Sequence, residues 1–160
     1  MSSKSPSGPR VAAIVGPYLS GKTSLLEAML AQAGTVNRKG TVKEANMVGD
    51  GTPEAKARQM STELNIATTD YLGEPWTFLD CPGSVELAQE FRNALMVTDT
   101  AIVVCEADPE KALTAGPVLQ FLGENSVPHL VFINKMDVHG HTVKATLDAL
   151  QEVSSLPLVL

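Results

Sequence analysis

The segment from Gly16 to Thr23 carries glycine, lysine and hydroxyl side chains at a spacing that suits phosphate binding. It matches G-x-x-x-x-G-K-[ST] and lies between an apolar run and a helical pattern. Glycines let the backbone curl so that its N–H groups face phosphate oxygens, and the following helix N-terminus adds partial positive charge. We expect Lys22 to reach the β- and γ-phosphates of a nucleotide and the Thr23 hydroxyl to bind Mg²⁺. The nucleotide-binding residues expected here are Gly16, Pro17, Tyr18, Leu19, Ser20, Gly21, Lys22, Thr23 and Ser24.

The tetrapeptide Asn134-Lys135-Met136-Asp137 indicates which base the nucleotide carries. It follows an apolar strand pattern and resembles the N-K-x-D guanine motif of GTPases. Guanine offers adjacent N1–H and N2–H₂ donors, which one ionised carboxylate accepts as a pair. Adenine would leave the Asp137 carboxylate facing an acceptor, a mismatch that can give discrimination of about 10⁴ to 10⁵. The resemblance gives Asn134 contacts to the base and the phosphate loop, and places the Lys135 stem over the base plane.

A third motif, Asp80-Cys81-Pro82-Gly83, ends another predicted strand. It resembles the D-x-P-G switch motif of GTPases, in which the aspartate holds Mg²⁺ through water and the glycine N–H meets the γ-phosphate. By that resemblance Asp80 is a metal and nucleotide residue, and Gly83 a nucleotide residue.

Together with these motifs, the stretch Val-Pro-His-Leu-Val-Phe-Ile-Asn-Lys-Met-Asp at residues 127–137 resembles the elongation factor G branch of translational GTPases. The resemblance covers the chain from Val11 onward. It implies a metal-binding switch threonine, for which Ser61 is the best match and Thr62 the neighbouring alternative. Gln59 stands where the family has glycine, which suggests a divergent paralogue.

Ser84 is the second departure from the family. The family has histidine after the D-x-P-G glycine, and that histidine positions the attacking water. Serine is shorter and has no imidazole. With Lys22 and Ser84 as the catalytic candidates, we expect nucleotide binding to persist and GTP hydrolysis to be slow.

The elements that must position these motifs alternate between strands and helices. We expect strands at residues 11–15, 63–71, 76–80, 100–105 and 129–134, and helices at 23–33, 85–97, 111–125 and 142–153. The two strands at 63–80 could pair as a hairpin through a Gly73-Glu74-Pro75 turn, and residues 35–60 read as a long mobile loop. This order predicts an α/β P-loop NTPase fold, with a mostly parallel sheet covered by helices on both faces and the ligand at the carboxyl ends of the strands.

Composition sets outer limits on location and partners. A net charge of -6 disfavours a stand-alone nucleic-acid binder, so we expect no direct DNA binding. Two cysteines are too few for a disulfide framework, and no apolar run reaches the ~20 residues of a membrane helix. We expect a cytoplasmic protein with GTP or GDP and Mg²⁺ as ligands, no membrane partner, and the ribosome as a partner of the full-length protein.

Domain organisation is expected to be simple. Residues 1–10 are rich in Ser, Pro and Gly and read as a disordered tail, while residues 11–160 form a GTP-binding domain. Ser154-Ser155 lacks the features of the last guanine-contacting loop, so the domain is expected to be incomplete at its C-terminal end.

Four functions stay open at this point. They are a GTP-hydrolysing ribosomal translocase or its paralogue, a guanine-nucleotide-binding regulator with weak or no hydrolysis, another translational GTPase of the ribosome-protection or release type, and a P-loop ATPase. Asp137 disfavours the last of these.

Overall fold

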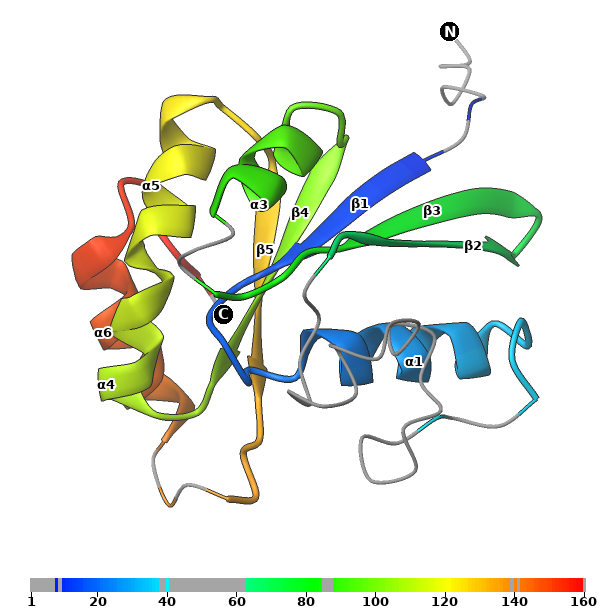
Figure 1. Ribbon diagram of the computed structural model, residues 1–160. Coiled ribbons are helices and arrows are strands. Elements are labelled where there is room, and N and C mark those ends of the chain that lie inside the picture. Colours follow the sequence, from blue (N-terminus) through cyan, green and yellow to red (C-terminus); the bar gives the residue numbers. More distant parts are fainter. Residues whose placement is uncertain are drawn as a thin grey trace, which may run out of the picture.

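A five-stranded sheet forms the centre of the molecule, in the strand order β2-β3-β1-β4-β5 (Figure 1). The computed structural model describes residues 8, 10–37, 40, 63–84, 88–138, 140 and 142–159. The strands are β1 (Arg10–Val15), β2 (Asn65–Tyr71), β3 (Glu74–Asp80), β4 (Thr100–Glu106) and β5 (His129–Asn134). The apolar run predicted to be a buried strand is the central strand β1.

Four of the five strands run parallel. Strand β1 pairs in parallel with β3 and with β4, and β4 pairs in parallel with β5. Among the described strands, only β2 is antiparallel, and it pairs with β3. The predicted mostly parallel sheet is therefore confirmed, and the carboxyl ends of β1, β3, β4 and β5 meet at one edge.

The hairpin of β2 and β3 is confirmed, but its turn is earlier and tighter than predicted. Leu72 and Gly73 form the turn, with φ angles of 54° and 80°, and Tyr71 pairs directly with Glu74. Two consecutive positive φ angles match the right-handed twist of a two-residue hairpin. Glu74 and Pro75 therefore belong to β3.

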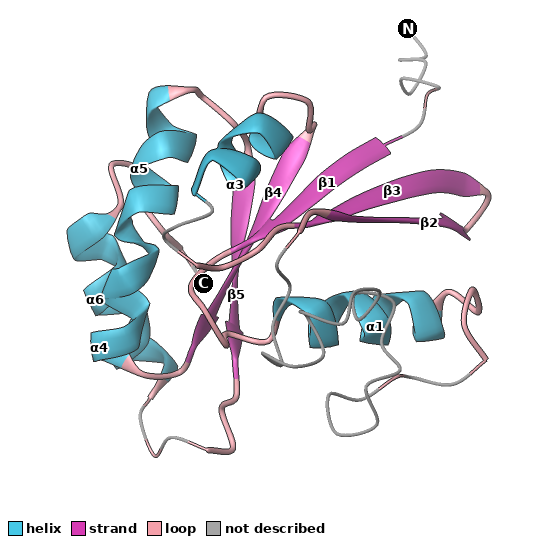
Figure 2. Cartoon of the chain, viewed as in Figure 1, coloured by secondary structure: helices cyan, strands magenta, loops and turns pink. Residues whose placement is uncertain are grey.

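Helices cover both faces of the sheet, as predicted (Figure 2). The helices α3, α4, α5 and α6 lie on one face, and α1 lies on the other (Figure 1). Their bounds are α1 (Lys22–Gln32), α3 (Ala88–Leu95), α4 (Pro109–Ala112), α5 (Gly116–Glu124) and α6 (Val143–Val153). Among the described helices, none has both the length and the hydropathy of a membrane span.

The helix predicted at residues 111–125 is instead three short segments: α4, a 3-10 turn at Leu113–Ala115, and α5. Pro117 explains the break, because proline lacks an N–H and its ring would clash with the Leu113 carbonyl in a continuous helix. The helical region also begins earlier than predicted. The Asp108 carboxylate caps it by accepting the backbone N–H of Glu110 at 3.1 Å.

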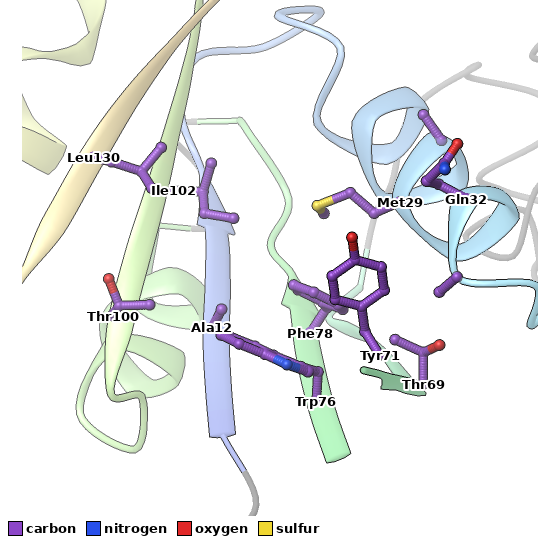
Figure 3. Close-up of a pocket in the computed structure, with 12 residues that line it drawn as sticks. Ala12, Met29, Gln32, Thr69, Tyr71, Trp76, Phe78, Thr100, Ile102 and Leu130 are labelled. Carbon is purple, nitrogen blue, oxygen red and sulfur yellow. The ribbon is translucent and has the colours of Figure 1, made fainter. Parts of the chain in front are cut away.

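An apolar pocket of about 480 Å³ lies between the C-terminal half of α1 and the sheet, beside the packed side chains of Leu26 and Leu30 (Figure 3). Met29 of α1, Trp76 and Phe78 of β3, and Ile102 of β4 point into it. None of the phosphate- or guanine-motif residues lines the cavity, so it is separate from the predicted nucleotide site.

Candidate nucleotide-binding site

The three sequence motifs meet at the carboxyl edge of the parallel strands. The phosphate loop follows β1, the Asp80 motif ends β3, and the guanine motif begins at the end of β5. Ligands of open α/β sheets bind at this edge, where loops from neighbouring strands converge. The topology therefore brings together segments that lie more than 110 residues apart in sequence.

Two glycines let the phosphate loop approach its neighbours closely. Gly16 has a φ of 137°, and a Cβ there would collide with the backbone carbonyl of Val104 in β4. Gly21 has a φ of 95°, and a Cβ there would collide with the side-chain amide of Asn134. Both positions combine a left-handed backbone with a lack of space, so a larger residue would push the loop away from β4 and β5.

Lys22 is the buried cation of the site. Its side chain is 7% exposed, and its ammonium donates a hydrogen bond to the Pro17 carbonyl at 2.9 Å. A Cβ at Gly83 would collide with this ammonium, so the loop after β3 passes directly over it. Burial lowers the pKa of Lys22 below its ordinary value, and the nearby Asp80 carboxylate opposes that shift. An ammonium as buried as this one is stabilised by an anionic ligand such as a phosphate.

Thr23 and Asp80 form the candidate metal site. The Thr23 hydroxyl donates to the fully buried Asp80 carboxylate at 2.6 Å. A hydroxyl and a carboxylate are hard oxygen ligands of the kind Mg²⁺ takes, and Mg²⁺ usually completes its shell with water and substrate phosphate. Within the described residues no group of three or more His, Cys, Asp or Glu side chains could hold a metal. The switch candidates Ser61 and Thr62 lie outside the described residues.

The guanine motif is tied to the phosphate loop by two side chains. The Asn134 amide donates to the Ser20 carbonyl at 2.9 Å, and the Lys135 ammonium donates to the Leu19 carbonyl at 2.6 Å. Asp137 is exposed, in the turn that follows β5. The loop contact expected of Asn134 is therefore present, and Asp137 is open to a ligand.

The remaining predicted residues surround this centre. Tyr18 and Leu19 are exposed on the outer side of the phosphate loop, whereas the Ser20 side chain is buried. Ser24 is half-buried in the first turn of α1, and Ser84 is half-buried directly after Gly83. The site thus has an exposed rim of phosphate-loop side chains and a buried floor.

Sequence reasoning missed one residue near the site, Glu106, and it did not indicate the environment of Cys81 in the Asp80 motif. Glu106, at the end of β4, is 5% exposed and binds the Lys135 ammonium at 2.8 Å. An acidic residue closing an apolar strand at the ligand edge was the available signal. Cys81 lies beside the buried centre, and burial together with Asp80 raises the pKa of its thiol to about 12.

Comparison with known proteins agrees with this arrangement. The family model described as the elongation factor Tu GTP binding domain matches residues 9–156.

The chain belongs to this family.

Within this family of GTP-binding domains, an elongation factor G-like protein of Synechocystis sp. is 53% identical over 150 residues, which is 94% of this chain and 22% of that protein. An elongation factor G-like protein of Mycobacterium tuberculosis is 31% identical over 158 residues, 97% of this chain and 22% of that protein. A crystal structure of a Thermus thermophilus protein superimposes with a TM-score of 0.82 at 31% identity, covering 89% of this chain and 22% of that one.

These comparisons confirm the predicted α/β P-loop fold and the resemblance to the GTP-binding domain of an elongation factor G-like translational GTPase. They also confirm GTP binding as the property of this domain family. The chain spans 22% of the length of the relatives described above.

Proposed function

We propose that this chain binds GTP and GDP as the nucleotide switch of an elongation factor G-like translation factor that acts on the ribosome in the cytoplasm. The observation that carries the proposal is the meeting of Lys22, the Thr23–Asp80 pair and Asn134-Lys135 around one loop. The similarity to elongation factor G-like proteins supports the choice of translation as the setting.

The phosphate region would bind the nucleotide through backbone N–H groups and one buried cation. Lys22 is held beside the loop by the Pro17 carbonyl, so its ammonium is already placed for the β- and γ-phosphates. Thr23 and Asp80 would hold Mg²⁺, which neutralises charge on the phosphate oxygens when bound. The base would lie beyond Asn134 and Lys135, with the exposed Asp137 carboxylate accepting its N1–H and N2–H₂ groups.

A second function, a regulator that binds nucleotide and hydrolyses it slowly, is favoured by Ser84. This half-buried serine follows Gly83, whose loop passes over Lys22. Phosphoryl transfer in GTPases depends largely on positioning and charge stabilisation, and the side chain at this point in the family orients the attacking water. A serine hydroxyl is too short to take the place of an imidazole.

Single-turnover hydrolysis separates the two functions. We expect the protein to bind GTP and GDP normally but to hydrolyse GTP slowly, and we expect Ser84→His to raise the rate roughly tenfold or more. GTP affinity should change less than about twofold, since the water-orienting group acts mainly in the transition state. Rates would be measured for the full-length protein with and without ribosomes, and affinities by calorimetry.

The matched control is Ser84→Ala, which removes the hydroxyl and adds no imidazole. Its hydrolysis rate should equal that of the wild type. A wild-type rate on ribosomes equal to that of a histidine-bearing homologue, with no gain in Ser84→His, would exclude the slow regulator and leave the ordinary translational GTPase. No ribosome stimulation in any variant would contradict the ribosomal role.

A further inference from the structure

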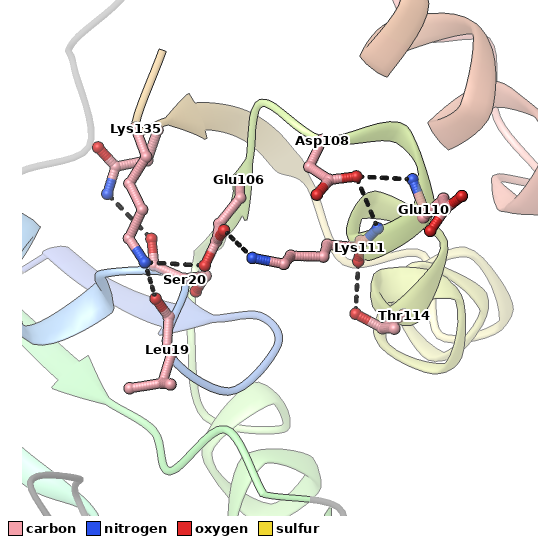
Figure 4. A network of polar contacts seen from close by, with 9 residues as sticks. Leu19, Ser20, Glu106, Asp108, Glu110, Lys111, Thr114 and Lys135 are labelled. Carbon is pink, nitrogen blue, oxygen red and sulfur yellow. Dashed lines mark hydrogen bonds and ion pairs between the residues drawn. The ribbon is translucent and has the colours of Figure 1, made fainter. Parts of the chain in front are cut away.

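Glu106 closes β4 with a carboxylate shared between two lysines (Figure 4). Its Oε1 accepts the Lys135 ammonium at 2.8 Å, and its Oε2 accepts the Lys111 ammonium at 2.7 Å. The Glu106 side chain is 6% exposed, against 34% for Lys135 and 53% for Lys111. Because a buried carboxylate must be paired, both lysines are drawn toward the end of β4.

The sheet register fixes Glu106 next to the guanine motif. Glu106 pairs with Asn134 in the parallel ladder of β4 and β5, and the Ala107 N–H donates to the Asn134 carbonyl at 2.9 Å. Lys135 is the next residue along the chain. The carboxylate therefore sits on a rigid strand at the root of the loop that would hold the base.

Lys135 joins this carboxylate to the phosphate loop. Its ammonium donates to the Leu19 carbonyl at 2.6 Å while it contacts Glu106 (Figure 4). Lys135 and Leu19 both have left-handed backbones, with φ angles of 56° and 59°. Such conformations are unfavourable for non-glycine residues, so they persist where surrounding contacts hold them.

We propose that Glu106 is a positioning residue for guanine-nucleotide binding. By fixing the Lys135 ammonium between its own carboxylate and the Leu19 carbonyl, it holds the lysine stem and the neighbouring Asn134 amide in place before the nucleotide binds. This inference rests on the proposed role of residues 134–137 in binding the base. Lys111 pairs with the other oxygen of the same carboxylate and is the more exposed of the two lysines.

The competing explanation is an ion pair that only stabilises the fold. A general loss of stability would lower the affinity for every ligand of the site. Loss of a positioning contact would lower the affinity only for ligands that carry the base. Inorganic tripolyphosphate serves as the probe of the phosphate region alone. Glu106→Gln keeps the side-chain shape and removes the charge. It also leaves one oxygen that can accept a hydrogen bond in place of two.

We expect Glu106→Gln to weaken GDP binding about tenfold, because the lysine loses its charged partner. The inhibition constant of tripolyphosphate should stay within about twofold of the wild type. Lys111→Met, the matched control, breaks the other ion pair of the same carboxylate and should change GDP affinity less than about twofold. Calorimetry with GDP and competition by tripolyphosphate would supply these values.

A double-mutant comparison completes the test. Lys135→Met should weaken GDP binding about tenfold or more, and adding Glu106→Gln to it should cost no further affinity, since Glu106 acts through Lys135. Additive losses, an unchanged GDP affinity in Glu106→Gln, or equal losses for GDP and tripolyphosphate would each overturn the inference and leave the proposed function standing. An unchanged GDP affinity in Lys135→Met would instead overturn the proposed base-binding role and the inference with it.

Discussion

The phosphate region and the base region of the site are held in place by different means. Around the phosphate loop, Lys22 and Asp80 are buried. Gly16 lets the loop lie against the backbone of β4, and Gly83 lets the loop after β3 lie against the Lys22 ammonium. At the base region, Asp137 is exposed, and Asn134 and Lys135 are fixed by side-chain hydrogen bonds to loop carbonyls. The phosphate region depends on close packing, whereas the base region depends on a few polar contacts.

This difference has a functional meaning. Phosphates are common to all nucleotides, so the tightly packed region can supply affinity without selecting a base. The exposed Asp137 carboxylate only accepts hydrogen bonds, so it selects a base that presents adjacent donors. We therefore expect mutations in the two regions to separate affinity from specificity.

The largest effect is expected at Asp137. Asp137→Asn replaces an acceptor pair by an amide, which can pair with the N1 side of xanthine but mismatches guanine. We expect the preference for GDP over XDP to change by about 10⁴-fold in favour of XDP. Competition of GDP, XDP and ADP against a fluorescent GDP analogue would measure it.

The control for Asp137→Asn lies in the other region. Lys22→Met should lower the affinity for GDP and XDP alike, by roughly 100-fold, because a charged hydrogen bond to phosphate is lost. Its GDP-to-XDP ratio should match that of the wild type. A changed ratio in Lys22→Met, or comparable binding of ADP and GDP by the wild type, would break the separation of affinity from specificity.

The next effect concerns the stability of the packed region. Gly16→Ala should lower the free energy of unfolding by roughly 3 kcal/mol or more, since a left-handed backbone and a collision with the Val104 carbonyl act together. Gly34→Ala is the matched control, because Gly34 has a φ of 78° but a Cβ added there would meet nothing within 4 Å. It should lose only about 1 kcal/mol. Urea unfolding curves would decide, and equal losses would show that close approach is unimportant.

The smallest effect concerns the buried thiol of Cys105 on β4. Burial raises the pKa of Cys105 from 9.0 to about 11. Above pH 9 the unfolded chain releases this proton while the folded protein keeps it. The contribution of Cys105 to the free energy of unfolding is therefore fully present below pH 9 and is lost as pH rises toward 11. We expect Cys105 to account for about 1 kcal/mol of lost stability between pH 8 and pH 10.

The change from pH 8 to pH 10 in the free energy of unfolding should therefore be about 1 kcal/mol smaller in Cys105→Ala than in the wild type. Comparing the two proteins removes the contribution of Lys22, whose lowered pKa acts in the opposite direction in the alkaline range. Urea unfolding at both pH values gives the measurement. Parallel pH dependence in the two proteins would show that Cys105 does not titrate as its burial requires.

The sequence alone determined the motifs and the order of elements. Phosphate-loop glycines, a lysine and a threonine at fixed spacing carry local chemistry, and short apolar runs between helical patterns predict parallel strands. Each of these patterns spans only a few consecutive residues, so it can be recognised from the sequence alone. The guanine motif was found in the same way, since Asp137 needs only its own carboxylate to match guanine.

The tertiary structure decided which residues touch. The contacts of Asn134 and Lys135 with the phosphate loop span 114 and 116 residues, and they exist because the sheet order places β4 next to β1 and β5 next to β4. Glu106 becomes part of the site only through the register that pairs it with Asn134. Local spacing cannot encode such neighbours, because sheet order and register are set by packing of the whole core.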